Sequence, residues 1–202
     1  MRNVNTNVAL RILGGKLRGQ NVRFVQTNTT RPTKAILRES LFGTLAGEIV
    51  GAVFVEMFAG SGSVGFEALS RGAQKVVFIE QNEANISQLR ENCARFKLTE
   101  SAQICCGDCF AILAPLLEQL CNCARSIVLY CDPPFAIREG QDRIYARCAE
   151  FLGNLCLDCV QHIIFETMSS ASLPPHIAHF VQYKKRAFGK SALQYYTKEI
   201  GC

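Results

Sequence analysis

The sequence has no long apolar run. No uninterrupted apolar stretch in its 202 residues approaches the roughly 20 residues that a membrane-spanning helix needs. The first residues, MRNVNTN, lack the apolar core of a secretory signal peptide, and neither internal repeats nor low-complexity segments occur. Because 49% of the residues are hydrophobic, we expect one globular domain with a small appendage. We expect it to be cytoplasmic, with no membrane partner.

The sequence also lacks the zinc-ribbon pattern, in which two matching Cys-x-x-Cys pairs are joined by a short loop. The eleven cysteines are odd in number, and several fall within apolar runs, so we predict reduced thiols that pack as small hydrophobes. Cys156-Leu-Asp-Cys159 and Cys105-Cys106-Gly-Asp-Cys109 have spacings found in zinc sites, but neither is completed as in a zinc ribbon. No metal is expected.

Charge is distributed unevenly along the chain. Residues 1–50 carry a net +6, residues 51–175 carry −5, and residues 176–202 carry +4. The basic terminal parts suggest a surface that contacts a polyanion, and the acidic middle part is expected to contain the catalytic residues. An ordinary solvated surface would show the same pattern, since blocks of like charge often only favour solubility.

Short apolar runs alternate with longer amphipathic segments from residue 52 onward. Strands are predicted at 53–58, 75–79, 103–106, 126–131 and 162–165, and helices at 33–45, 63–70, 83–95, 110–120 and 142–155. Two further strands at 180–184 and 192–196 predict a closing antiparallel hairpin. The fold class is therefore α/β: a Rossmann-like, doubly wound, seven-stranded, mainly parallel sheet with a C-terminal hairpin. Residues 1–30 are predicted as a small basic β arm, and residues 31–202 as the main domain.

A glycine-rich loop follows the first strand of the main domain. It comprises Phe58, Ala59, Gly60, Ser61 and Gly62, with Gly65 in the helix behind it. Glycine allows a tight turn and close approach of a ligand to the backbone, so this loop is predicted to bind a nucleotide-type cofactor. The pattern alone is weak, because strand-to-helix turns favour glycine in many α/β folds.

Acidic residues end the next two strands. Glu80 stands twenty positions after Gly60, where a carboxylate can accept hydrogen bonds from both hydroxyls of a ribose. Asp108 ends the third strand, within reach of an adenine amino group. The neighbouring Gln81 and Cys109 are included among the predicted cofactor contacts. Either acid could instead only cap the helix that follows it.

The fourth strand ends in Asp132-Pro133-Pro134-Phe135. Two prolines remove two backbone donors and leave nearby carbonyls able to accept hydrogen bonds from a ligand. An exocyclic amine on a planar base suits a carboxylate, a carbonyl and a stacking aromatic ring. The alternative is a simple proline turn at the end of a strand.

All these sites lie at the carboxyl ends of successive predicted strands, where open α/β sheets bind ligands. A nicotinamide cofactor would explain the glycines and Glu80 but not the Asp132 corner. S-adenosylmethionine explains all of them, with Asp132 also contacting the cofactor.

The chain also resembles the class I methyltransferases, and among them the bacterial 16S rRNA guanine-N2 methyltransferases that modify guanine 966. The resemblance spans nearly the whole chain and rests on four groups of residues: Arg11–Gly19, Arg31–Thr33 with Arg38–Phe42, Phe58–Gly62 with Gly65–Gly72, and Asp132–Phe135. It implies methyl transfer to the N2 amine of one guanine of 16S rRNA, within a small-subunit particle. Asp132, Pro133, Pro134 and Phe135 match the catalytic motif. The cysteine-rich third and fourth strands and the longer N-terminal tail depart from the family pattern.

RNA contacts are predicted in the basic N-terminal part. Arg11, Lys16, Arg18, Arg31 and Arg38 are expected to hold the RNA backbone while the target base is flipped toward Phe135. Two alternatives stay open: a DNA adenine-N6 methyltransferase, and a non-catalytic RNA-binding or assembly module with the same fold.

Overall fold

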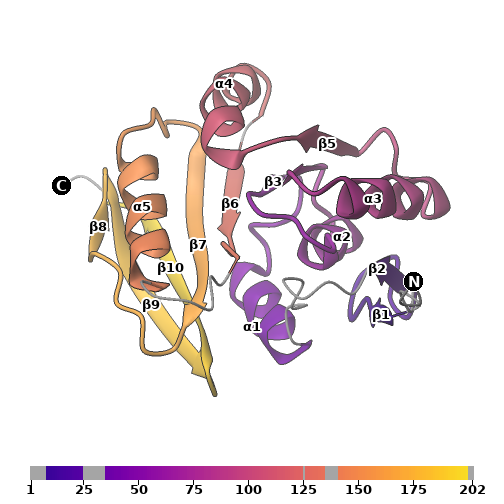
Figure 1. Cartoon of the computed structure of the whole chain (residues 1–202), viewed down its shortest axis with the longest axis horizontal. Helices are drawn as coiled ribbons and strands as arrows, with labels where there is room; N and C mark the ends of the chain where they lie inside the picture. The colour runs from indigo at the N-terminus through magenta and orange to yellow at the C-terminus, as the bar shows by residue number, and fades with distance from the viewer. Residues whose placement is uncertain (1–7, 25–34, 125, 135–140, 200–202) are drawn as a thin grey trace, which may run out of the picture.

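A mostly parallel β-sheet with helices on both faces forms the centre of the protein (Figure 1). The computed structural model describes residues 8–24, 35–124, 126–134 and 141–199. Eight strands follow the order β5-β4-β3-β6-β7-β10-β9-β8. Their bounds are β3 Val53–Glu56, β4 Lys75–Glu80, β5 Ala102–Cys106, β6 Ile127–Cys131, β7 Val160–Met168, β8 His176–Ile177, β9 Phe180–Phe188 and β10 Ser191–Lys198. No helix in the described ranges is long and apolar enough to cross a membrane.

Within the described ranges, five helices cover the sheet. They are α1 Ala35–Leu45, α2 Ser63–Ser70, α3 Glu83–Arg95, α4 Cys109–Cys121 and α5 Gln141–Gly153. The first three pack in one apolar cluster on one face, and α4 and α5 pack in a second cluster on the other. Strands β3 and β6 are buried along their whole length, as expected of central parallel strands covered on both sides. The predicted doubly wound architecture is confirmed.

The antiparallel end of the sheet is larger than predicted. Strand β10 pairs antiparallel with both β7 and β9, which confirms the expected hairpin. The two-residue strand β8 pairs with the start of β9 and makes eight strands instead of the seven predicted. Two residues cannot show an alternating apolar pattern, so the sequence carried no signal for β8.

The N-terminal residues form a separate two-stranded sheet. Strands β1 (Val8–Arg11) and β2 (Asn21–Phe24) pair antiparallel, and we call residues 8–24 the arm. The arm packs on α2 and α3 through its buried side chains, among them Ile12 and Val22. This sheet confirms the small β appendage expected from the sequence.

The side chain of Glu67 on α2 fixes the turn of the arm. Its carboxylate is fully buried and accepts hydrogen bonds from the backbone nitrogens of Leu13 and Gly14, both at 2.8 Å. Arg71 Nε donates to the same carboxylate at 2.8 Å, and Arg38 Nε lies 3.9 Å away. A buried carboxylate is tolerated only with such partners, so Glu67 and the arm backbone stabilise each other.

Ser70, one turn further along α2, holds the same turn. Its hydroxyl accepts from Leu17 N at 2.9 Å and donates to Gly14 O, and its carbonyl accepts from Lys16 N at 2.7 Å. Gly15 has a φ of 77°, and a Cβ there would lie 1.8 Å from Ser70 O. Only glycine can occupy this position without moving the arm away from α2.

Two cysteines are joined, contrary to the prediction of reduced thiols throughout. Cys121 at the end of α4 forms a disulfide with Cys159, just before β7, with a Cα–Cα distance of 5.3 Å. The crossover through β6 brings together residues 38 positions apart, and sequence spacing gave no sign of this pairing. The other eight cysteines in the described ranges are free, and no group of three or more His, Cys, Asp or Glu within those ranges could hold a metal ion.

Replacing Glu67 by Gln should loosen the arm. The amide keeps one acceptor oxygen but turns an NH₂ toward backbone donors, so we expect the free energy of unfolding to fall by about 3 kcal/mol. Urea unfolding measures this loss, and limited proteolysis should show earlier cleavage within the arm. Glu118→Gln, on an exposed glutamate of α4, is the matched control. Equal stability and equal protease resistance of the two variants would contradict the role assigned to Glu67.

Candidate active site

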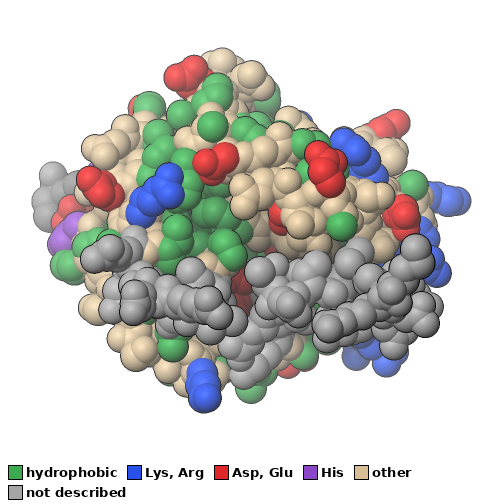
Figure 2. All heavy atoms as spheres, in the orientation of Figure 1, with side chains coloured by type: hydrophobic (Ala, Val, Ile, Leu, Met, Phe, Trp, Pro, Cys, Tyr) green, Lys and Arg blue, Asp and Glu red, His purple; other side chains and the backbone are tan. Residues whose placement is uncertain are grey.

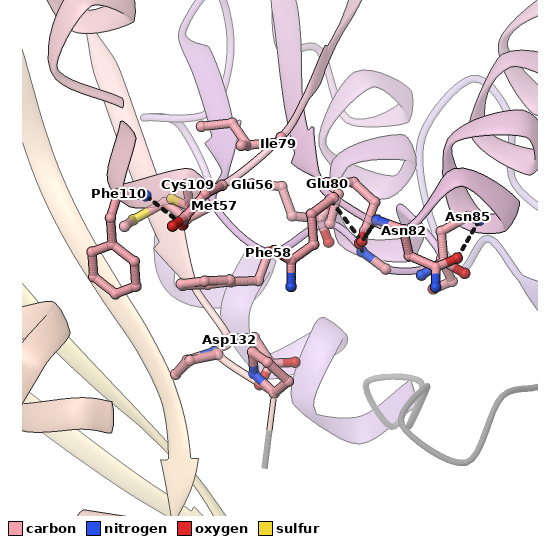
Figure 3. Close-up of a pocket in the computed structure, with 18 of the residues that line it drawn as sticks. Glu56, Met57, Phe58, Ile79, Glu80, Asn82, Asn85, Cys109, Phe110 and Asp132 are labelled. Carbon is pink, nitrogen blue, oxygen red and sulfur yellow. Dashed lines mark hydrogen bonds between the residues drawn. The ribbon is translucent and has the colours of Figure 1, made fainter. Parts of the chain in front are cut away.

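A cavity of about 560 Å³ opens at the carboxyl ends of the parallel strands. The predicted residues that line it are Phe58, Ala59, Gly60 and Ser61 after β3, Glu80 and Gln81 at the end of β4, Asp108 and Cys109 after β5, and Asp132, Pro133 and Pro134 after β6. Figure 3 shows Phe58 in the centre of the cavity, with Glu80 on one side, Phe110 on the other and Asp132 facing it from below. The fold thus brings four separate strand ends to one site.

The glycines of the loop have different roles. Gly60 lines the cavity with a φ of 51°, and a Cβ placed there would meet no protein atom within 4 Å. Gly62 and Gly65 were also predicted as cofactor contacts but do not line the cavity. A Cβ at Gly62 would lie 2.4 Å from Leu89, and one at Gly65 would lie 2.4 Å from Phe78. These two glycines allow α2 to pack closely on the sheet and on α3.

Glu80 organises the backbone around it. Its Oε2 accepts from Gly60 N at 2.6 Å, and its Oε1 accepts from Gln81 N and Asn82 N at 2.9 and 2.8 Å. The cap of α3 is Asn82, whose side chain accepts from Ala84 N and Asn85 N. Glu80 is therefore not the helix cap, and its carboxylate borders the cavity beside the glycine loop.

Asp108 caps the helix that follows it and also lies at the cavity. Its Oδ1 accepts from Phe110 N at 3.0 Å, which caps the N-terminus of α4. The residue also lines the cavity. The capping bond fixes the side chain and positions the aromatic ring of Phe110, two residues later, at the cavity wall.

Glu56 lies beneath the loop and was not predicted. It is 3% exposed and lines the cavity floor, and its Oε2 accepts from Gly65 N at 2.9 Å. Burial raises the pKa of Glu56 from its ordinary value of 4.5 to about 8, and hydrogen bonds from the backbone of Gly65 and Val64 only partly offset this. The only available signal was its place at the end of a strand, four residues before Gly60.

Phe110 and Arg147, two residues beside the predicted Phe58, were also missed. The Phe110 ring contacts the Phe58 ring edge to face, with centroids 6.1 Å apart, and Arg147 on α5 lies 3.9 Å above the Phe110 ring. Further lining residues outside the prediction are Met57, Ser63, Ile79, Asn82, Asn85, Gly107 and Ile144. Helix α5 is the next element after the Asp132 corner, but no local motif in its sequence indicates that Ile144 and Arg147 face the cavity.

The predicted RNA contacts are divided between surface and interior. Arg11, Lys16 and Arg18 are exposed on the arm. Arg38 is 2% exposed and donates to Arg11 O at 2.8 Å, so its guanidinium holds the arm from inside and does not face a ligand at the surface. Arg31, and Phe135 of the predicted catalytic motif, lie outside the described residues.

Comparisons with known proteins identify the family of the chain. The family described as Conserved hypothetical protein 95 matches residues 10–197. The chain belongs to this family. A relative from Escherichia coli K12, named Ribosomal RNA small subunit methyltransferase D, is 30% identical over 190 residues, covering 94% of this chain and 90% of the relative. The protein of the same name from Haemophilus influenzae is 33% identical over 145 residues, covering 71% and 73%.

A solved structure shares the family fold. An Escherichia coli protein named as a methyltransferase aligns with a TM-score of 0.73 and 28% identity, covering 96% of this chain and 100% of that one. The fold is therefore the Rossmann-like methyltransferase fold. The resemblance stated from the four sequence motifs is confirmed.

The buried carboxyl of Glu56 predicts a pH dependence of stability. Between pH 4.5 and about 8 the native protein keeps this proton while the unfolded chain has released it, so stability from this group falls as pH rises through that range. Glu56→Gln removes the titration. Urea unfolding at pH 5.5 and 8.5 should therefore show a larger loss of stability in the wild type than in Glu56→Gln. Parallel losses in both proteins would show that Glu56 does not titrate in this range.

Proposed function

We propose that the protein transfers a methyl group from S-adenosylmethionine to the exocyclic N2 amine of a guanine in small-subunit (16S) rRNA. One observation carries the proposal: Asp132 and the two prolines lie in the same cavity as Glu80 and Asp108. The cavity can thereby hold a nucleoside cofactor next to a corner suited to an amine. The names of the relatives support rRNA as the substrate class.

The residues present fit S-adenosylmethionine. Glu80 is the acceptor for the ribose hydroxyls, and Asp108 is the acceptor for the adenine amino group. The open space over Gly60 leaves room for the chain that joins ribose and amino acid. The rings of Phe58 and Phe110 supply an apolar wall of the kind that lines most small-molecule sites.

The chemistry centres on Asp132. Bound in the cavity, the cofactor supplies a methyl group on a positively charged sulfur. The Asp132 carboxylate accepts a hydrogen bond from the guanine amine, and a carbonyl of the proline turn accepts the second. These bonds orient the nitrogen lone pair, which is otherwise delocalised into the ring, and hold it in line for attack. In the transfer the nitrogen would form a bond to the methyl carbon as the methyl–sulfur bond breaks, a neutral thioether would leave, and one amine proton would pass to the Asp132 carboxylate or to water. Positioning, without a covalent intermediate on the protein, provides the rate.

The RNA must present the base to this cavity. A stacked guanine does not expose its amine in line with the methyl group, so the base is flipped out at a cost of a few kcal/mol. Phe135 stays the predicted stacking partner. Exposed Arg11, Lys16 and Arg18 on the arm, with Arg31, are proposed to hold the RNA backbone, while Arg38 is omitted because it is buried.

The decisive experiment measures transfer of labelled methyl to purified small-subunit rRNA, with and without its ribosomal proteins, followed by nucleoside analysis. We expect N2-methylguanosine, reduced at least a hundredfold in kcat by Asp132→Ala because the amine loses its orienting carboxylate. Comparing naked rRNA with the protein-bound particle identifies the true substrate state. N6-methyladenine in DNA, or RNA binding without any methyl transfer, would replace the proposal by one of the two alternatives.

Glu80→Gln tests the cofactor site separately. The variant should bind S-adenosylmethionine about tenfold or more weakly by calorimetry, because charge-assisted hydrogen bonds to the ribose are lost. Its affinity for RNA should not change. Glu83→Gln, an exposed acid in the first turn of α3 that does not line the cavity, is the matched control. Unchanged cofactor affinity in Glu80→Gln would argue against this assignment.

A further inference from the structure

The arm is docked on α3 through its backbone. Asn92, fully buried on α3, accepts from Arg23 N at 3.2 Å and donates from its Nδ2 to Arg23 O at 2.7 Å. The side-chain amide thus pairs with β2 as a neighbouring strand would. Since the docking bonds use only the backbone of Arg23, its exposed side chain points out of this contact.

A second arginine reaches the same place from α3. Arg95 Nη2 donates to Asn92 Oδ1 at 2.8 Å and to Asn21 O on β2. A guanidinium has five N–H donors, so bonds made by this one nitrogen leave donors for a further partner. We call Arg23 and Arg95, with Asn92 between them, the β2–α3 seam.

The seam brings two cationic residues to one buried amide. Arg23 N and Arg95 Nη2 both donate to Asn92 Oδ1, so docking of the arm places these two residues at the same interface, where the repulsion of their charges opposes association. Burial lowers the pKa of Arg95, and the positive charge of Arg23 lowers it further. Glu91 raises the pKa of Arg95, and its own carboxylate accepts from Gln88 Nε2 at 3.0 Å. An anion bound between Arg23 and Arg95 would turn their repulsion into attraction.

We propose that the β2–α3 seam binds a backbone phosphate of the RNA substrate. The proposal rests on the proposed function, because it takes RNA as the substrate. Arginine is well suited to the role, since its planar fork matches the oxygens of a phosphate. The seam adds two cations to the arm residues considered so far and extends the contact surface onto α3.

The location of the seam supports a backbone contact. Lys and Arg side chains line the margin of the molecule next to α3 and the arm (Figure 2). The seam lies on the α2 and α3 side of the sheet, and none of its residues lines the cavity. A contact of this kind positions an RNA without reading its sequence. It should therefore affect RNA affinity and not the chemical step.

The test measures binding of small-subunit rRNA at several salt concentrations. Arg23→Gln should weaken binding about three- to tenfold and reduce the slope of log K against log salt by about one, the effect of losing one phosphate contact. Arg23→Lys keeps the charge and should keep the slope. Because the backbone of Arg23 makes the docking bonds, neither substitution removes them, and kcat at saturating RNA should be unchanged.

Arg90→Gln is the matched control. Arg90 is an exposed arginine of the same helix, but it lies toward β5, with its Nη2 3.4 Å from Cys106 Sγ. The Arg90→Gln variant should bind RNA with the affinity and the salt slope of the wild type. If Arg23→Gln binds RNA with wild-type affinity and an unchanged salt slope, the seam does not bind a phosphate, even if methyl transfer proceeds. Failure of the wild type to methylate any RNA would refute the proposed function instead, so the two failures are distinguishable.

Discussion

The buried carboxylate of Glu67 joins the two parts of the protein. Helix α2 begins at the glycine loop of the cavity and carries Glu67 and Ser70, which hold the turn of the arm. One eight-residue helix therefore sets the position of the arm relative to the cavity. Because Glu67 is fully buried, separating the arm would leave its charge without the partners that compensate its desolvation. Glu67 and Ser70 thus attach the arm to the helix that begins at the cavity.

A second buried acid lies under the cavity. Gly65 N, in the first turn of α2, donates to Glu56, and burial raises the pKa of this carboxyl to about 8. A neutral carboxyl group accepts the hydrogen bond from Gly65 N without placing a full negative charge below Glu80 and Asp108. The carboxylates of Glu80, Asp108 and Asp132 also line the cavity, so the buried acid and the acids at the rim lie within one small volume.

Local patterns predicted most of the fold and part of the site. The bounds of α2 and α3 agree with the prediction, because clear turn and cap residues flank their apolar periodicity. The strand-end residues were found because parallel strands bring their carboxyl ends together. Arg38, the Cys121–Cys159 pair and Arg147 could not be placed, since their surroundings come from elements distant in sequence. The sequence alone does not distinguish a buried basic residue such as Arg38 from an exposed one.

Backbone docking of the arm has a consequence for how such a protein can change. Glu67, Ser70 and Asn92 bind main-chain groups of the arm, which every residue type except proline provides in full. The outward side chains can therefore be exchanged while the attachment stays intact. The charge and shape of the outer surface of the arm can thereby change during evolution without loss of its attachment to α2 and α3.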